Sequence, residues 1–131
     1  MKNYLIILLL FLSVGFSQQI IHTETYDNGN IKSITYHKKT RDRIEKVKFE
    51  KYYENGQKEK EGTYKDGKKD GLWTYWNENG QKKSEVTYKN GELDGLWISW
   101  FENGQKKTEG TWKDGNLISV KGWNEDGSVK E

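Results

Sequence analysis

Four aromatic residues recur at a nearly fixed interval and are the clearest candidates for binding chemistry. They are Tyr52, Trp76, Trp100 and Trp123, separated by 24, 24 and 23 residues. Tyrosine and tryptophan rings are the usual hot spots of protein interfaces, and their flat apolar faces also suit a glycan chain. We therefore predict that these four residues bind a partner. A second interpretation stays open, in which the rings only shield a thin sheet and stack on Lys83 and Lys107 through cation–π contacts.

Residue types that carry catalysis are sparse. The only two histidines, His22 and His37, have no nucleophile or metal-ligand motif around them. Asp70 and Asp94 recur in a D-G-L-W block and bring to mind a Ca²⁺ loop or a pair of glycosidase carboxylates, but the EF-hand ligand order is missing and lysines surround them. We expect these acids to form bends before strands, and we predict no catalytic, cofactor-binding or metal-binding residue.

The elements that position the aromatic residues come from an internal repeat. The sequence D-G-L-W at 70–73 returns at 94–97, and N-G-Q-K-K at 79–83 returns at 103–107. A period of 24 residues indicates one supersecondary unit that buries its apolar surface against its neighbours.

Asn-Gly and Asp-Gly pairs punctuate the chain at regular spacing. These pairs favour type I′ turns between antiparallel strands, and the absence of proline leaves every backbone N–H free to join a ladder. We therefore predict an all-β fold, an elongated antiparallel meander of β-hairpins built from 24-residue repeats.

Two-residue loops at Asn79-Gly80 and Asn103-Gly104 fix a register. The register of the first hairpin places Trp73 opposite Val86, Tyr75 opposite Ser84 and Trp76 opposite Lys83. The register of the second places Trp97 opposite Gly110 and Trp100 opposite Lys107. One face then carries the core column of Phe49, Trp73 and Trp97 beside Gly62, Val86 and Gly110. The other face carries Tyr52, Trp76, Trp100 and Trp123 opposite Glu59, Lys83 and Lys107, and we expect it to be half solvated.

The chain divides into three segments. Residues 1–17 read as a signal peptide, with Lys2, an apolar run too short to span a bilayer, and small residues at Gly15 and Ser17. An uncleaved anchor or a buried strand is the alternative. Residues 18–50 are a degenerate N-terminal repeat or cap in which His37 to Arg43 lengthen a loop, and residues 51–131 are the repeat array with an incomplete C-terminal unit. The chain has 0 Cys, so no disulfide staples it in an oxidising compartment.

Charge argues against polyanionic partners. Removing residues 1–17 takes one Lys from the 22 basic residues and none of the 20 acidic residues, which leaves a net charge of +1. This balance provides no field to attract nucleic acid or an anionic membrane, and we expect no stable membrane span after cleavage.

The repeat unit Y-x-x-N-G-Q-x-K-x-E-G-x-Y/W-K-x-G-x-x-D-G-L-W-x-x-W/Y resembles the MORN-repeat variant of bacterial proteins, including YwqK-like antitoxins. The resemblance covers Lys51 to Trp123 well, carried above all by G-T-Y-K-D-G-K-K-D-G-L-W at 62–73. It implies an elongated β-hairpin array without agreed catalytic residues, and the antitoxin label implies a protein partner.

We accordingly expect an exported, non-enzymatic repeat module, periplasmic or extracellular, that uses no cofactor and binds a protein or an envelope component. A glycan-binding module, an immunity or antitoxin-like protein, and a small envelope hydrolase are the alternatives.

Overall fold

The computed structural model describes residues 4–7 and 18–131, and these residues form strands and turns only. The prediction of an all-β fold is confirmed. None of the described segments is a helix of the length and hydrophobicity that crossing a bilayer requires. The strands are β1 (Tyr4–Ile7), β2 (Gln18–Thr25), β3 (Ile31–Lys39), β4 (Ile44–Tyr52), β5 (Lys58–Lys65), β6 (Lys68–Lys69), β7 (Gly71–Trp76), β8 (Lys82–Lys89), β9 (Glu92–Trp100), β10 (Lys106–Lys113) and β11 (Asn116–Gly122).

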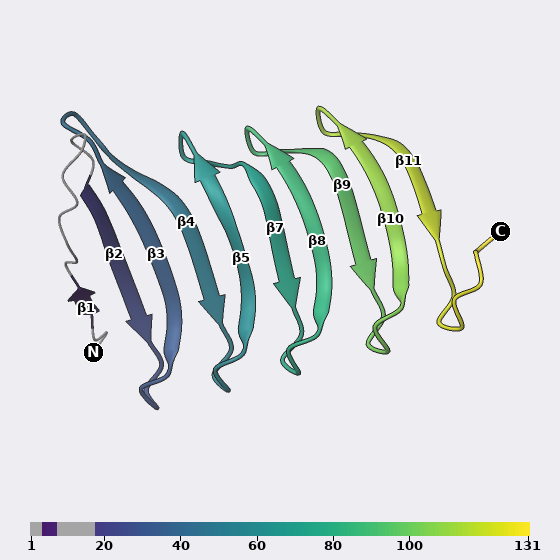
Figure 1. Cartoon of the computed structure of the whole chain (residues 1–131), viewed down its shortest axis with the longest axis horizontal. Helices are drawn as coiled ribbons and strands as arrows, with labels where there is room; N and C mark the ends of the chain where they lie inside the picture. Colours follow the sequence, from purple (N-terminus) through teal and green to yellow (C-terminus); the bar gives the residue numbers. More distant parts are fainter. Residues whose placement is uncertain (1–3, 8–17) are drawn as a thin grey trace.

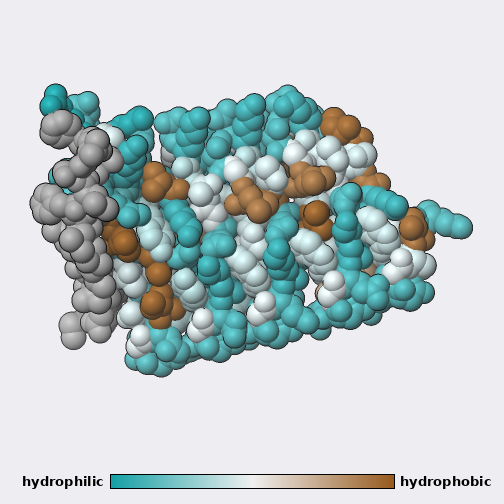
Figure 2. Space-filling model, in the orientation of Figure 1, coloured by the Kyte–Doolittle hydropathy of each residue, from teal (hydrophilic) through white to brown (hydrophobic). Residues whose placement is uncertain are grey.

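The strands lie side by side in a single sheet in the order of the chain. The order is β1-β2-β3-β4-β5-β7-β8-β9-β10-β11, with the short β6 paired to β5, and every ladder is antiparallel. Figure 1 shows this meander as one curved layer with turns aligned along two edges. Figure 2 shows hydrophilic residues along most of both turn edges, with a hydrophobic group at the right end of the upper edge and scattered hydrophobic residues on the face between them.

The predicted signal peptide lies mostly outside the described residues, and its cleavage site after Ser17 is among the residues that are not described. Tyr4–Ile7 form β1 and pair with Ile21–Glu24 of β2. Cleavage stays a prediction, and its consequence would be that β2 becomes the outer strand of that edge.

Two kinds of turn alternate, which corrects the prediction that all the Asn-Gly and Asp-Gly pairs form type I′ loops. At Asp66-Gly67, Asn90-Gly91 and Asp114-Gly115 both residues have positive φ, as type I′ turns require. At Asn79-Gly80 and Asn103-Gly104 only the glycine has positive φ. There Gly80 N–H donates to the Asn77 carbonyl at 2.9 Å and Asn77 N–H donates to the Gln81 carbonyl at 2.9 Å, the pattern of a type I turn followed by a G1 bulge.

The second kind of turn shifts the register at one end of each hairpin. The pairs Trp73↔Val86, Tyr75↔Ser84 and Trp97↔Gly110 are confirmed. The predicted partners nearer the turn are wrong: Tyr52 pairs with Lys58, Trp76 with Lys82 and Trp100 with Lys106. Glu59, Lys83 and Lys107 are the extra residues that the bulges leave without a partner in these ladders.

The core column is present, and its centre is Trp73. Trp73 is 1% exposed and Val86 is 8% exposed, whereas Trp97 is only half-buried. Trp73 lies across Gly62, where an added Cβ would come within 2.2 Å of the indole, and Tyr64 meets it edge-on at 5.2 Å between ring centres. We call this side of the sheet the Trp73 face and the opposite side the Trp76 face.

Backbone contacts between successive turns hold the repeats in register. Gly91 N–H donates to the Lys69 carbonyl at 2.8 Å, and Gly115 N–H donates to the Leu93 carbonyl at 2.9 Å. In the degenerate unit the predicted long loop is shorter than expected, because His37–Lys39 belong to β3 and residues 40–43 alone make the turn, closed by Thr40 N–H to the Arg43 carbonyl.

Candidate functional site

The four predicted partner-binding residues lie together on the Trp76 face. Tyr52, Trp76 and Trp100 are the last residues of β4, β7 and β9, and Trp123 follows β11, where it bridges Val129. All four side chains are half-buried. Since neighbouring strands are about 4.8 Å apart and each repeat adds two strands, the rings form a row with a step of roughly 9–10 Å. We call this row the aromatic stripe.

A lysine from one repeat covers the ring of the next. The ammonium of Lys58 lies 5.7 Å from the centre of the Trp76 ring, Lys82 lies 5.8 Å from Trp100, and Lys106 lies 5.2 Å from Trp123. The expected cation–π contacts therefore exist, but Lys58, Lys82 and Lys106 make them in place of Lys83 and Lys107. Lys107 instead lies 5.5 Å from the Phe101 ring.

Each of these lysines is also held by a glutamate three residues further on. The ion pairs Lys58–Glu61, Lys82–Glu85 and Lys106–Glu109 measure 2.6, 2.5 and 2.5 Å. The lysine side chains keep 30%, 51% and 39% of their surface exposed. The aromatic stripe is thus a repeated set of one ring, one ammonium and one carboxylate.

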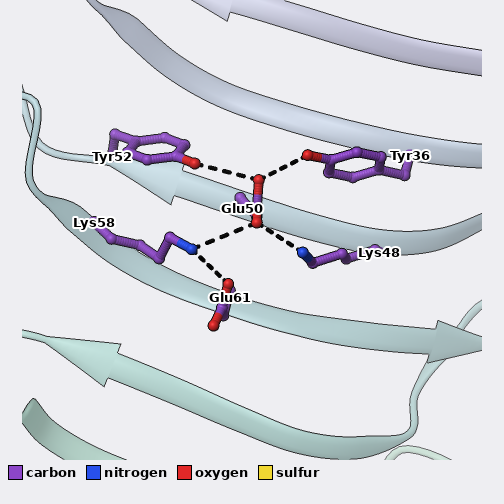
Figure 3. A network of polar contacts seen from close by, with 6 residues as sticks. All are labelled: Tyr36, Lys48, Glu50, Tyr52, Lys58 and Glu61. Atoms are coloured by element: carbon purple, nitrogen blue, oxygen red, sulfur yellow. Dashed lines mark hydrogen bonds and ion pairs between the residues drawn. The ribbon is translucent and has the colours of Figure 1, made fainter.

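A buried carboxylate interrupts this pattern at the N-terminal end of the stripe. Glu50 of β4 is 6% exposed. It accepts hydrogen bonds from the hydroxyls of Tyr36 at 2.9 Å and Tyr52 at 3.2 Å, and from the ammonium groups of Lys48 at 2.8 Å and Lys58 at 3.4 Å. Figure 3 shows the carboxylate between two phenols and two lysines.

The surroundings of Glu50 fix its charge. Burial alone would raise its pKa, but hydrogen bonds from Lys48 and Tyr36 and the charges of Lys58 and Lys48 outweigh that effect and lower the pKa to about 2. Burial and then the hydrogen bond to Glu50 raise the pKa of Tyr36 to about 12. Burial, followed by the charge of Glu50, also raises the pKa of Tyr52. These shifts hold Glu50 as a carboxylate and both tyrosines as neutral phenols near neutral pH, which fits a network that stabilises the fold.

The Glu50 network was missed in the sequence. Its signal is a strand segment in which Lys48, Glu50 and Tyr52 alternate on one face, while the equivalent positions of the next repeats, Thr74 and Ile98, carry no charge.

Lysines also cap rings on the Trp73 face. Lys69 lies 4.2 Å from the centre of the Trp73 ring and 4.8 Å from that of Tyr88, and it donates a hydrogen bond to the Tyr75 hydroxyl at 3.0 Å. Lys46 lies 4.1 Å from the Tyr64 ring. These contacts explain how an indole becomes fully buried in a single-layer sheet.

The two acidic residues that were considered as catalytic candidates accept hydrogen bonds in the turns. Asp70 accepts the backbone N–H of Asn90 at 3.2 Å, and Asp94 accepts that of Asp114 at 3.3 Å, so both acids tie one turn to the next. His22 and His37 lie on neighbouring strands, and burial, then the charges of His22 and Lys46, lower the pKa of His37. Across residues 4–7 and 18–131, no three His, Cys, Asp or Glu side chains come together in a way that could hold a metal ion.

Comparison with known families matches the regular part of this sheet. The family model of the MORN repeat variant matches residues 47–66, 69–90 and 93–114. The first match begins in β4, and the third ends in the turn between β10 and β11, so the matched copies cover the part of the sheet that carries Tyr52, Trp76 and Trp100. No curated protein and no solved structure matches the chain.

Proposed function

From three MORN repeat variants joined in one continuous sheet, we propose that this protein is an exported, non-enzymatic module that binds another protein on its Trp76 face. Repeats of this family are commonly protein- or membrane-binding modules. The observation that carries the proposal is the aromatic stripe, in which each half-buried ring stands beside an ammonium and a carboxylate.

The step of the stripe suits an extended polypeptide. A polyproline II segment has three residues per turn and rises by about 3.1 Å per residue, so every third residue of such an extended peptide lying across the sheet would meet the next ring. Tyrosine and tryptophan supply apolar area at low entropic cost, and the flanking Lys and Glu offer both signs of charge to polar groups of the partner.

A glycan of the envelope is the second candidate, because a row of rings at this step also suits consecutive sugar units. The charges beside each ring favour the polypeptide, since a polypeptide can add charged groups that complement them and a neutral sugar cannot. An immunity role against an exported toxin is a special case of protein binding. A toxin gene beside the gene for this protein would support that role. A small envelope hydrolase is the least supported alternative, because Asp70 and Asp94 already serve as turn acceptors.

The test is capture of a partner from the native envelope fraction by the purified protein and by Trp76→Ala, Trp100→Ala and Trp123→Ala. We expect each substitution to weaken capture while the circular dichroism spectrum stays that of the parent. Trp112→Ala is the matched control, because this half-buried tryptophan of β10 pairs with Gly95 and Leu117 and lies on the Trp73 face. Unchanged capture in all three stripe variants would refute the proposal, and binding of polysaccharide in place of protein would favour the glycan alternative.

A further inference from the structure

Asparagine followed by glycine is prone to lose its side-chain amide, and such pairs form several turns of this sheet. The asparagines of these pairs are Asn28, Asn55, Asn79, Asn90 and Asn103. All of them are exposed to solvent. Glycine has no side chain to shield its backbone nitrogen, and asparagine is among the thermally labile residues. Exposure and local sequence therefore do not separate these sites, and the difference between them lies in their hydrogen bonds.

Along one edge of the sheet, both ends of each of these side-chain amides have a partner. The Asn55 oxygen accepts the Gln57 N–H at 2.9 Å, and the Asn55 amide nitrogen donates to the Glu78 carbonyl at 2.9 Å. The oxygen likewise accepts a backbone N–H, and the nitrogen donates to an oxygen atom, in Asn28, Asn79 and Asn103. Both bonds must be released before the side-chain carbonyl can turn toward the nitrogen of the following glycine.

Asn90 lies on the other edge, and its side chain is not held in this way. Within residues 4–7 and 18–131 the Asn90 side-chain amide has no hydrogen-bond partner, whereas the Asn90 backbone N–H donates to the Asp70 carboxylate at 3.2 Å. The N–H of the next residue, Gly91, donates to the Lys69 carbonyl at 2.8 Å. That contact does not set Asn90 apart, because the glycine N–H of each other Asn-Gly pair also donates to a backbone carbonyl, at 2.9 or 3.0 Å. Asn90 can therefore turn its side chain toward the glycine without breaking a hydrogen bond of that side chain.

We propose that Asn90 is a site of spontaneous deamidation in this protein. The Gly91 backbone nitrogen gives its proton to water or hydroxide and attacks Cγ of the Asn90 side chain. A bond forms between Cγ and this nitrogen, the bond from Cγ to the side-chain nitrogen Nδ2 breaks, and Nδ2 takes up a proton and leaves as ammonia. Water then adds to either carbonyl of the resulting succinimide and opens the ring, which yields aspartate or isoaspartate. The co-reactant is water, and neither an oxidant nor a reductant is needed.

The turn that holds Asn90 accommodates the aspartate product. Asn90 has φ 51°, and aspartate occupies the same place in the neighbouring Asp-Gly turns, with φ 50° at Asp66 and 47° at Asp114. The opposite edge differs, since an aspartate in place of Asn55 would lose the amide that donates to the Glu78 carbonyl. Conversion of Asn90 to aspartate therefore adds a negative charge to the turn between β8 and β9 and keeps the fold.

Peptide mapping by mass spectrometry, on the purified full chain held at mildly alkaline pH, tests the assignment. Releasing two hydrogen bonds slows a reaction by about 30-fold, so Asn90 should deamidate about 30-fold faster than Asn55 or Asn103. Incubation in water enriched in heavy oxygen should label the product at Asn90. In urea, which removes the hydrogen bonds of the fold, the rates at all the Asn-Gly pairs should become similar. Equal rates in the folded protein, an earlier reaction at another asparagine, or a lead of Asn90 that persists in urea would each overturn the proposal.

Two substitutions test whether the turn accepts the aspartate product. Asn90→Asp carries the charge of the product in the intact backbone and should leave the Tm of the full chain unchanged. Asn55→Asp is the matched control, because it makes the same chemical change in another exposed Asn-Gly turn but removes the hydrogen bond to the Glu78 carbonyl, and it should lower the Tm. A Tm for Asn90→Asp that is equal to or below that of Asn55→Asp would contradict the inference.

Discussion

Replacing Gly62 with alanine tests the packing on which the sheet depends. An added Cβ at this position would come within 2.2, 2.3 and 2.5 Å of three atoms of the Trp73 indole. Trp73 is 1% exposed and meets Tyr64 at 5.2 Å and Tyr88 at 6.5 Å, so the indole has no free space to move into. Either the backbones of β5 and β7 separate or Trp73 leaves its site.

The change in the free energy of unfolding for Gly62→Ala is the sum of two opposing effects. The backbone of Gly62 does not have positive φ, so alanine by itself would stabilise the protein by about 0.4–1 kcal/mol through the unfolded chain. Overpacking costs roughly 1–3 kcal/mol and occasionally more, and expelling Trp73 would cost about 3–5 kcal/mol. We expect a net loss of about 3 kcal/mol, equivalent to a fall in Tm of roughly 10–20 °C.

Gly110 provides the matched control. It occupies the same column opposite Trp97, but an added Cβ would lie 3.3 Å from Trp112 and 3.4 Å from Trp97, distances that a small shift can relieve. Gly110→Ala should therefore change the free energy of unfolding by less than about 1 kcal/mol. Urea unfolding followed by tryptophan fluorescence measures both variants. Equal losses at the two sites would show that the contact with Trp73 does not set the cost, and a Gly62→Ala/Trp73→Leu double variant should lose less than the two single changes added together.

Three further predictions concern stability and processing. Trp73→Ala should lower the free energy of unfolding by about 3–5 kcal/mol, and Trp100→Ala by roughly half of that, because Trp100 is only half-buried. If chemical denaturation ranked the two variants the other way, the Trp76 face and not the Trp73 face would be the core side of the sheet. Folding lowers the pKa of Glu50 from 4.5 to about 2, so Glu50 stabilises the protein above pH 4.5. That contribution, about 3 kcal/mol, is lost as the pH falls toward 2. Glu50→Gln should therefore reduce the loss of stability between pH 4.5 and pH 2, and an unchanged loss would count against the network. Intact-mass measurement of the exported protein should show loss of residues 1–17, and recovery of the complete chain from the membrane fraction would contradict cleavage.

The sequence was sufficient for the fold because the repeat restates the same local rules several times. Each hairpin combines alternating strand residues with Asn-Gly or Asp-Gly punctuation, and consecutive strands of a meander are neighbours, so local pairing gives the topology. The same reasoning placed Tyr52, Trp76, Trp100 and Trp123 on one face, which the structure shows.

The register beside the turns could not be predicted, since the same dipeptide makes two different turns. Asn90-Gly91 has positive φ at both residues, whereas in Asn79-Gly80 only the glycine does, and the residues alone do not distinguish them. The choice depends on how neighbouring turns stack and on the bulge that each hairpin accommodates, and this one-residue difference moved the lysine partners from Lys83 and Lys107 to Lys82 and Lys106.

The sequence by itself determined the all-β meander, the two faces and the position of the aromatic stripe, because these depend on the two-residue period of a strand and on contacts between chain neighbours. Only the tertiary structure decided which side chains meet across strands. It brought Tyr36 and Lys58, which are 14 and 8 residues from Glu50 in the chain, onto one buried carboxylate, and it placed Lys69 over Trp73 to complete its burial. Such contacts require the register and the curvature of the whole sheet, which no single repeat encodes.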